Sequence, residues 1–113
     1  MIGIDLVEIE RVSELYSRYK ERFVQRILAE EEIEQFNNKK DKETFLAKRW
    51  AVKEAYFKAK GTGILNQSDF KTVWVTYDQL GKPLLNTRDG TPGHVSITDT
   101  ERYAQAIVML TSS

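Results

Sequence analysis

The segment between Asp41 and Gly61 constrains the fold of this chain more than any other feature of its sequence. On a helical wheel, its apolar side chains occupy nearly the whole circumference, with one bulky stripe and one stripe of alanines four residues apart. A helix that is apolar all round is buried, so the segment predicts a long central helix ending near Lys60. Asp41 can cap this helix, and Gly61 can end it in a left-handed conformation. The alanines would let another backbone approach closely.

The rest of the chain divides into a helical first half and a second half with the period of strands. Residues 2–7 alternate as a short strand, and apolar residues at steps of three and four predict one amphipathic helix from Ile9 to Phe23. A shorter helix is expected over residues 30–36. In the second half, strands are expected at residues 73–77, 84–85, 94–98 and 103–110. This order predicts an α+β fold with a largely antiparallel sheet, in one domain over residues 1–113.

The composition excludes several classes of protein. The 113 residues include no cysteine, which rules out disulfides and thiolate ligands and fits a reducing compartment. No apolar stretch approaches the length of a membrane span, and the first residues lack the pattern of a secretory signal. No RNA-recognition pattern occurs. We therefore expect a cytoplasmic protein that binds neither membrane nor nucleic acid.

The net charge is zero, but basic residues gather in two zones. Residues 11–26 hold five basic residues against two acidic ones, and residues 39–60 hold eight against three. Such zones can attract a phosphate-bearing ligand or an acidic protein, and they can equally be ordinary solvated faces.

Three charged residues stand at unusual places. Glu54 and Lys58 fall between the bulky stripe and the alanine stripe, where charge is costly unless it is paired or ligates an ion. They form either an internal salt bridge or a cleft in which Glu54 binds a cation or a proton and Lys58 neutralises phosphate. Asp5 stands within a predicted strand, where aspartate is disfavoured. It either caps the next helix or ligates a metal, since two carboxylates with waters and phosphate oxygens suit Mg²⁺.

The sequence also resembles a known family along almost its whole length. Residues 3–9 (GIDLVEI) resemble the opening signature of the holo-acyl-carrier-protein synthases, and residues 45–55 (FLAKRWAVKEA) resemble the central signature. Further matches follow in order at residues 58–59, 61–63, 81–83, 94–97 and 103–104.

This resemblance implies a 4′-phosphopantetheinyl transferase fold of the short, bacterial type. Such an enzyme transfers the 4′-phosphopantetheine group of coenzyme A to a serine of acyl carrier protein, releasing 3′,5′-ADP, in fatty acid biosynthesis. Asp5 and Glu54 would hold Mg²⁺, or Mn²⁺, beside the diphosphate of coenzyme A. Glu54, directly or through a water bound to the metal, would act as the base. Lys58 would offset charge on the leaving phosphate, so Asp5, Glu54 and Lys58 are the implied catalytic residues.

The resemblance implies contacts and partners as well. The implied coenzyme-binding residues are Arg49, Lys58, Gly61, Thr62, Gly63, Pro83 and Ser96. Acyl carrier proteins are acidic, and the implied docking residues are Arg11, Arg18, Arg22 and Arg26. The resemblance to this short type also implies a homotrimer with active sites at the subunit interfaces. Such an assembly would explain how so small a fold encloses coenzyme A.

The sequence departs from the family pattern at positions that bear on the site. Asp99 stands where many members have a histidine. The resemblance therefore does not imply, for this chain, the contact that the histidine would make with the nucleotide end of coenzyme A. Lys48 replaces a common glycine, and Trp50 replaces a common phenylalanine. The main alternative is a non-catalytic domain that binds an acidic protein or a nucleotide. The larger transferases that serve polyketide or peptide synthetases contain two such halves, so the length of this chain argues against that type.

Overall fold

The computed structural model describes residues 1–61 and 67–111, with the side chains of residues 67 and 68 excepted. Thr62 and Gly63, which were expected at the coenzyme, therefore lie outside the described residues. Within the described ranges, none of the helices combines the length and the apolar character that crossing a bilayer requires.

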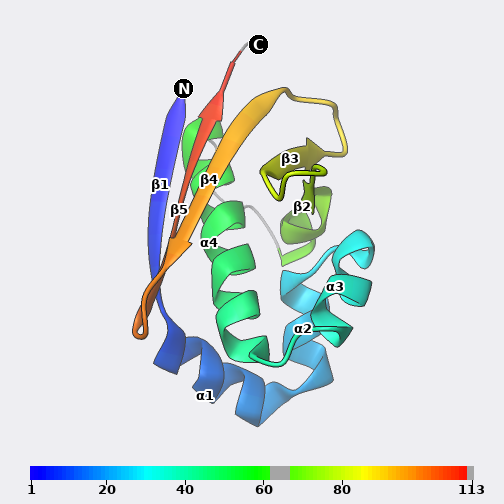
Figure 1. The fold of residues 1–113 in the computed structure, drawn as a ribbon, viewed down its shortest axis with the longest axis vertical. Helices are drawn as coiled ribbons and strands as arrows, with labels where there is room; N and C mark the ends of the chain where they lie inside the picture. The colour runs from blue at the N-terminus through cyan, green and yellow to red at the C-terminus, as the bar shows by residue number, and fades with distance from the viewer. Residues whose placement is uncertain (62–66, 112–113) are drawn as a thin grey trace.

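The elements follow the predicted order of helices first and strands later (Figure 1). They are β1 (Ile2–Glu8), α1 (Ile9–Tyr19), α2 (Glu21–Ile27), η1 (Glu30–Glu32), α3 (Ile33–Asn37), α4 (Lys42–Lys60), η2 (Gln67–Thr72), β2 (Val73–Tyr77), β3 (Pro83–Thr87), β4 (Gly93–Asp99) and β5 (Tyr103–Leu110).

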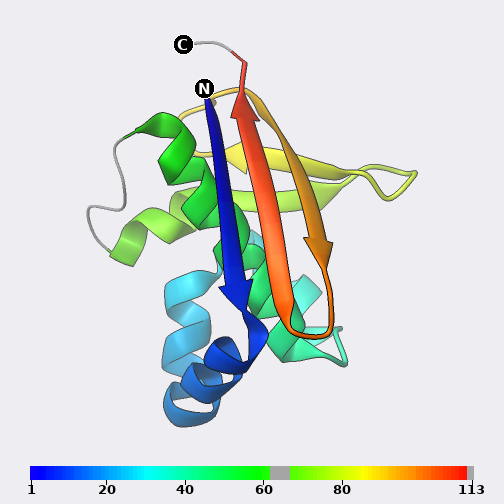
Figure 2. The same cartoon turned by 90° about the vertical axis from the view of Figure 1, so that its left-hand side faces the viewer.

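Helix α4 lies at the centre of the fold. A three-stranded antiparallel sheet of order β1-β5-β4 covers one side of it, and α2, α3 and the β2–β3 hairpin lie on the other, while α1 runs below the lower end of α4 in Figure 1 (Figures 1 and 2). The chain pairs its first strand with its last, so residues far apart in sequence share one sheet. The predicted α+β fold with an antiparallel sheet and a buried central helix is confirmed, although the strands form two sheets rather than one.

Both predicted ends of α4 are confirmed. The carboxylate of Asp41 accepts hydrogen bonds from the backbone N–H and the hydroxyl of Thr44, at 3.1 and 2.7 Å. Gly61 ends the helix at φ 77°, a left-handed conformation that glycine adopts without strain.

The strand β1 lies unusually close to α4 at Gly3. A Cβ atom on this glycine would stand 2.0 Å from the carbonyl oxygen of Ala55 and 2.6 Å from the backbone nitrogen of Ala59. The close approach that the alanine spacing predicted is therefore present. Asp5 lies two residues further along β1, and because side chains alternate along a strand, it shares the helix-facing side with Gly3.

The predicted single helix from Ile9 to Phe23 is wrong. The chain turns at Lys20, which has a φ of 51°, and this turn divides the segment into α1 and α2. A positive φ at a lysine costs about 1–3 kcal/mol. The turn lets α2 bury Phe23, Val24 and Ile27, and each such side chain contributes about 1.5–3 kcal/mol when buried. Tertiary burial therefore outweighs the local helical pattern.

Replacing Gly3 with alanine tests the contact between β1 and α4. Both clashing atoms belong to the helix backbone and cannot yield, so Gly3→Ala is expected to lower the free energy of unfolding by about 3 kcal/mol or more. Urea denaturation measures the loss. Gly81→Ala is the matched control, since Gly81 has positive φ but open space around its Cβ position, and should lose only about 1–2 kcal/mol. A Gly3→Ala chain no less stable than this control would contradict the close approach.

Candidate functional site

Asp5 and Lys58 meet where β1 packs on α4. The Nζ of Lys58 lies 2.9 Å from Oδ1 of Asp5 and donates a second hydrogen bond to the carbonyl of Ile4, at 3.1 Å. The side chain of Asp5 is 14% exposed and that of Lys58 is 55% exposed. The wheel had placed Lys58 among apolar stripes, so its exposure corrects that expectation. Asp5 caps no helix, since Glu8 precedes α1 and makes no side-chain cap.

Glu54 lies one helical turn before Lys58 but does not pair with it. Its Oε1 instead accepts a hydrogen bond from the indole Nε1 of Trp50, at 3.1 Å, and the carboxylate is half-buried. The internal Glu54–Lys58 salt bridge, one of the two readings of the sequence, is therefore absent from this pair of described residues. Sequence reasoning treated Trp50 as a core residue and missed this contact.

The carboxylate oxygens of Asp5 and Glu54 suit a hard cation such as Mg²⁺, with a phosphate-bearing ligand supplying further oxygens. Within residues 1–61 and 67–111, Oδ2 of Asp5 and Oε2 of Glu54 accept no hydrogen bond, and each carboxylate keeps one oxygen free. No cluster of three or more metal-ligating side chains gathers in these ranges, so the protein alone would not fill a coordination shell. Mg²⁺ is usually held by one or two carboxylates, with waters and substrate phosphates completing six ligands. The residues present fit that pattern.

An apolar cavity of about 390 Å³ opens beside Glu54. Leu15, Tyr19, Phe23, Arg26 and Ile27 line it from α1 and α2, and Trp50, Glu54 and Phe70 line it from α4 and η2. A carboxylate at the wall of an apolar hollow, with an arginine at the same wall, can receive a ligand that is part apolar and part polar.

Four arginines are displayed on the same two helices. Arg11, Arg18, Arg22 and Arg26 are all exposed, and none of them pairs with a carboxylate of the described residues. The guanidinium of Arg11 lies over the ring of Trp50, 5.9 Å from its centre. Unpaired cations on one surface are available to an acidic partner.

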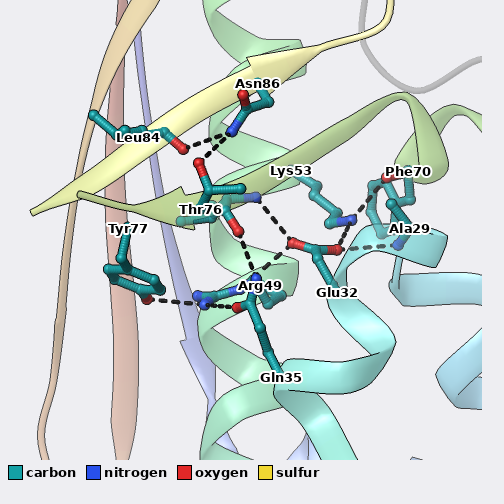
Figure 3. Close-up of polar contacts among 11 residues, drawn as sticks. Ala29, Glu32, Gln35, Arg49, Lys53, Phe70, Thr76, Tyr77, Leu84 and Asn86 are labelled. Carbon is teal, nitrogen blue, oxygen red and sulfur yellow. Dashed lines mark hydrogen bonds and ion pairs between the residues drawn. The ribbon is translucent and has the colours of Figure 1, made fainter. Parts of the chain in front are cut away.

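Arg49 does not face a ligand in this chain. It is 1% exposed and belongs to a buried ionic cluster with Glu32 and Lys53, both fully buried (Figure 3). Its Nε lies 3.4 Å from Glu32, and its Nη2 donates hydrogen bonds to the side chains of Gln35 and Tyr77. We therefore leave Arg49 out of the coenzyme site.

Glu32 is the centre of this cluster. Its Oε1 accepts from Lys53 at 2.6 Å and from the backbone of Ala29 at 3.0 Å, and its Oε2 accepts from the backbone of Val75 (Figure 3). Lys53 also donates to the carbonyl of Phe70, at 2.9 Å. Burial lowers the pKa of Lys53 to about 8, and the carboxylate of Glu32 opposes this shift by favouring the ammonium.

The helical wheel of α4 already indicated that two members of this cluster, Arg49 and Lys53, are buried. With Leu46 at zero, Arg49 and Lys53 fall at roughly 300° and 340°, beside or within the bulky stripe. Two basic residues on an apolar face predict a buried anion, but nothing near them in sequence identifies Glu32.

The remaining predicted coenzyme contacts are dispersed in this chain. Gly61 ends α4 and is exposed, and Pro83 begins β3 and is half-buried. Ser96 is exposed on β4, and the register pairs it with Ile107, whose neighbour on β1 is Ile4. Ser96 thus lies on the outer face of the sheet, opposite to the face that carries Asp5.

Two departures from the family pattern contact each other. The Nζ of Lys48 lies 3.5 Å from Oδ1 of Asp99, and both side chains are partly exposed. The lysine on α4 and the aspartate at the end of β4 therefore form an ion pair, which exposure to water keeps weak.

Comparisons with known proteins agree with this fold. The family model described as the 4′-phosphopantetheinyl transferase superfamily matches residues 1–108. The holo-[acyl-carrier-protein] synthase of Vibrio cholerae is 43% identical over 120 residues, covering 96% of this chain and 94% of that protein. The corresponding protein of Staphylococcus haemolyticus is 44% identical over 112 residues, covering 96% and 93%.

Solved structures with the same name share the fold. The synthase of Neisseria meningitidis superposes with a TM-score of 0.89 at 32% identity, covering 98% of this chain and 97% of that one. The Bacillus anthracis synthase, in complex with coenzyme A (3′,5′-ADP), has a TM-score of 0.88 at 38% identity, covering 99% and 96%. The Helicobacter pylori synthase, in complex with coenzyme A, has a TM-score of 0.86 at 28% identity, covering 98% and 100%.

The fold and the family match thus define a member of the 4′-phosphopantetheinyl transferase superfamily. Within it, the chain belongs to the holo-acyl-carrier-protein synthase family, which confirms the family that the sequence resembled.

Proposed function

We propose that this chain transfers the 4′-phosphopantetheine group of coenzyme A to a serine of acyl carrier protein and releases 3′,5′-ADP. The observation that carries the proposal is the ion pair of Asp5 and Lys58 where β1 packs on α4, with Glu54 one helical turn before Lys58, within a fold shared with holo-acyl-carrier-protein synthases. The relatives bound to coenzyme A support that molecule as the donor. This activity belongs to fatty acid biosynthesis, and we place it in the cytoplasm and in one domain over residues 1–113.

The chain's own residues account for the steps of the reaction. Asp5 and Glu54 would hold Mg²⁺, or Mn²⁺, which would neutralise the diphosphate and align it for in-line displacement. Glu54 accepts the proton of the carrier's serine hydroxyl as the serine oxygen bonds to the phosphorus next to pantetheine. The bond from that phosphorus to the bridging oxygen breaks, and the leaving phosphate carries the electron pair. Lys58, whose side chain is exposed, would turn from Asp5 and offset the new charge.

We propose that acyl carrier protein docks on α1 and α2. The four exposed arginines supply charge opposite to that of an acidic carrier, and the apolar cavity beside them leads to Glu54. Complementary charge of this kind raises association rates and fixes orientation, and salt screens it.

We further propose a homotrimer in which subunits meet at the outer face of the three-stranded sheet. Ile2, Ile4, Leu6, Ile107 and Met109 on this face are exposed by 62, 52, 57, 38 and 49%. A contiguous apolar patch of this kind marks an interaction site. The number of subunits follows the family resemblance. Ser96 lies on this face, so it would serve a coenzyme site shared between subunits, to which Lys58, Gly61 and Pro83 are also assigned.

The non-catalytic alternative loses both of its supports. It required Glu54 and Lys58 to form a salt bridge and Asp5 to cap a helix, and neither interaction occurs between these described residues.

Transferase activity is tested by mass spectrometry of apo carrier protein after incubation with coenzyme A, Mg²⁺ and this protein. We expect a pantetheine mass gain that EDTA abolishes. Glu54→Gln should fold normally and lower turnover by about 100-fold or more, because the base and one cation ligand are removed together. Glu34→Gln, at an exposed glutamate of α3, is the control. Undiminished turnover in Glu54→Gln would remove the proposed role of this carboxylate.

The docking face is tested by charge reversal. Arg18→Glu should raise the KM for carrier protein several-fold while changing the KM for coenzyme A little, and added salt should shrink the difference. Lys40→Glu makes the same charge change at an exposed lysine outside this face. Equal effects on both KM values would show that the carrier docks elsewhere.

Assembly is tested by the solution mass from light scattering. The wild-type chain should have three times the mass of one subunit, and Ile107→Glu, at the centre of the outer sheet face, should shift it toward the monomer. Leu80→Glu, at the 95% exposed tip of the β2–β3 hairpin, should leave the mass unchanged. A wild-type monomer, or an unaltered mass in Ile107→Glu, would refute this interface.

A further inference from the structure

Trp50 holds Glu54 by a hydrogen bond from its indole N–H. The indole N–H is a donor only, and it lies 3.1 Å from Oε1 of Glu54, one turn further along α4. Phenylalanine would place a smaller aromatic ring there without a donor. The bond therefore fixes one carboxylate oxygen and leaves Oε2 free of partners among the described residues.

The indole itself is held from two sides. The ring of Phe23 meets it edge-on, with 5.8 Å between ring centres and 62° between planes, and the guanidinium of Arg11 lies 5.9 Å from its centre. Both partners come from the helices that cover this side of α4, so α1 and α2 set the orientation of the donor. A fixed donor in turn limits the rotamers that Glu54 can adopt.

We propose that Trp50 is a positioning residue, whose N–H orients the Glu54 carboxylate so that Oε2 is presented to the divalent cation. The inference rests on the proposed cation site at Asp5 and Glu54. Groups that orient a metal ligand in this way typically change metal affinity by about 10- to 100-fold when they are removed. A purely structural role would alter stability and leave metal affinity unchanged.

The test is Mn²⁺ binding measured by electron paramagnetic resonance, with saturating coenzyme A, in the wild-type, Trp50→Phe, Trp74→Phe and Glu54→Gln chains. Trp50→Phe keeps an aromatic ring but removes the donor together with part of the ring, and Trp74→Phe removes the same atoms at a site away from Glu54. Trp74→Phe is the matched control, because Trp74 lies on β2 beneath Arg88 and is the only other tryptophan of the chain. Circular dichroism and thermal melting verify that each variant folds.

We expect wild-type protein and Trp74→Phe to bind Mn²⁺ alike, Glu54→Gln to bind it poorly, and Trp50→Phe to bind it about tenfold more weakly than wild type. Equal Mn²⁺ affinity in Trp50→Phe and wild type would overturn the inference and leave the proposed function standing. If Glu54→Gln binds as well as wild type, or wild type binds no Mn²⁺, the cation site itself fails and the inference fails with it.

A second measurement does not depend on replacing Trp50. In the Trp74→Phe chain all tryptophan fluorescence comes from Trp50, so Mg²⁺ titration in the presence of coenzyme A should change the emission. Adding Glu54→Gln to that chain should abolish the change. Emission that Mg²⁺ leaves unaltered, in a chain that binds Mn²⁺, would also overturn the inference.

Discussion

The separation between β1 and α4 is the constraint on which the site depends. Gly3 has no side chain, and so the strand lies directly against the helix backbone at Ala55 and Ala59. This contact belongs to the core, yet it decides where a functional group lies: Asp5, two residues along the same strand, is thereby brought to Lys58. A Cβ at position 3 would move the strand outward and carry the carboxylate with it. Core packing therefore sets the distance between two charges that lie 53 residues apart in the sequence.

Helix α4 uses the angular spacing of its residues to keep two sets of charges apart. Lys53 and Glu54 are adjacent in sequence but roughly 100° apart around the axis. Lys53 therefore turns inward to Glu32 and ties η1 and β2 to the helix, whereas Glu54 turns toward the cavity beneath α1 and α2. The buried set joins η1 and β2 to the helix, and the half-exposed set is the one we propose for chemistry. Trp50, between α1, α2 and Glu54, connects the surface assigned to carrier docking with the carboxylate assigned to the cation.

The sequence predicted best those features that depend on local chemistry. The cap at Asp41, the left-handed end at Gly61 and the strand periods are set by nearby residues, and all are present in the structure. The turn at Lys20 was missed because distant packing decides it. The partners of Glu54 and Lys58 were missed for a related reason: a wheel gives the angle of a side chain but not the element that covers it. The burial of Lys53 was within reach of the wheel, but its partner Glu32 lies 21 residues away, with no pattern joining them. The family was predictable because its signatures are short and ordered.

The ionic cluster around Glu32 has a consequence for how this chain can diverge over evolutionary time. Removing one member of a buried ion pair costs about 3–5 kcal/mol, a large share of the roughly 5–15 kcal/mol that keeps a domain folded. Positions 32, 49 and 53 can therefore drift only through coordinated replacements, since each single step passes through a poorly folded ancestor. The arginines displayed on α1 and α2 have no such partners and can be exchanged one at a time. Related proteins can therefore change the residues of their docking surface to suit a different carrier while the buried ionic cluster stays the same.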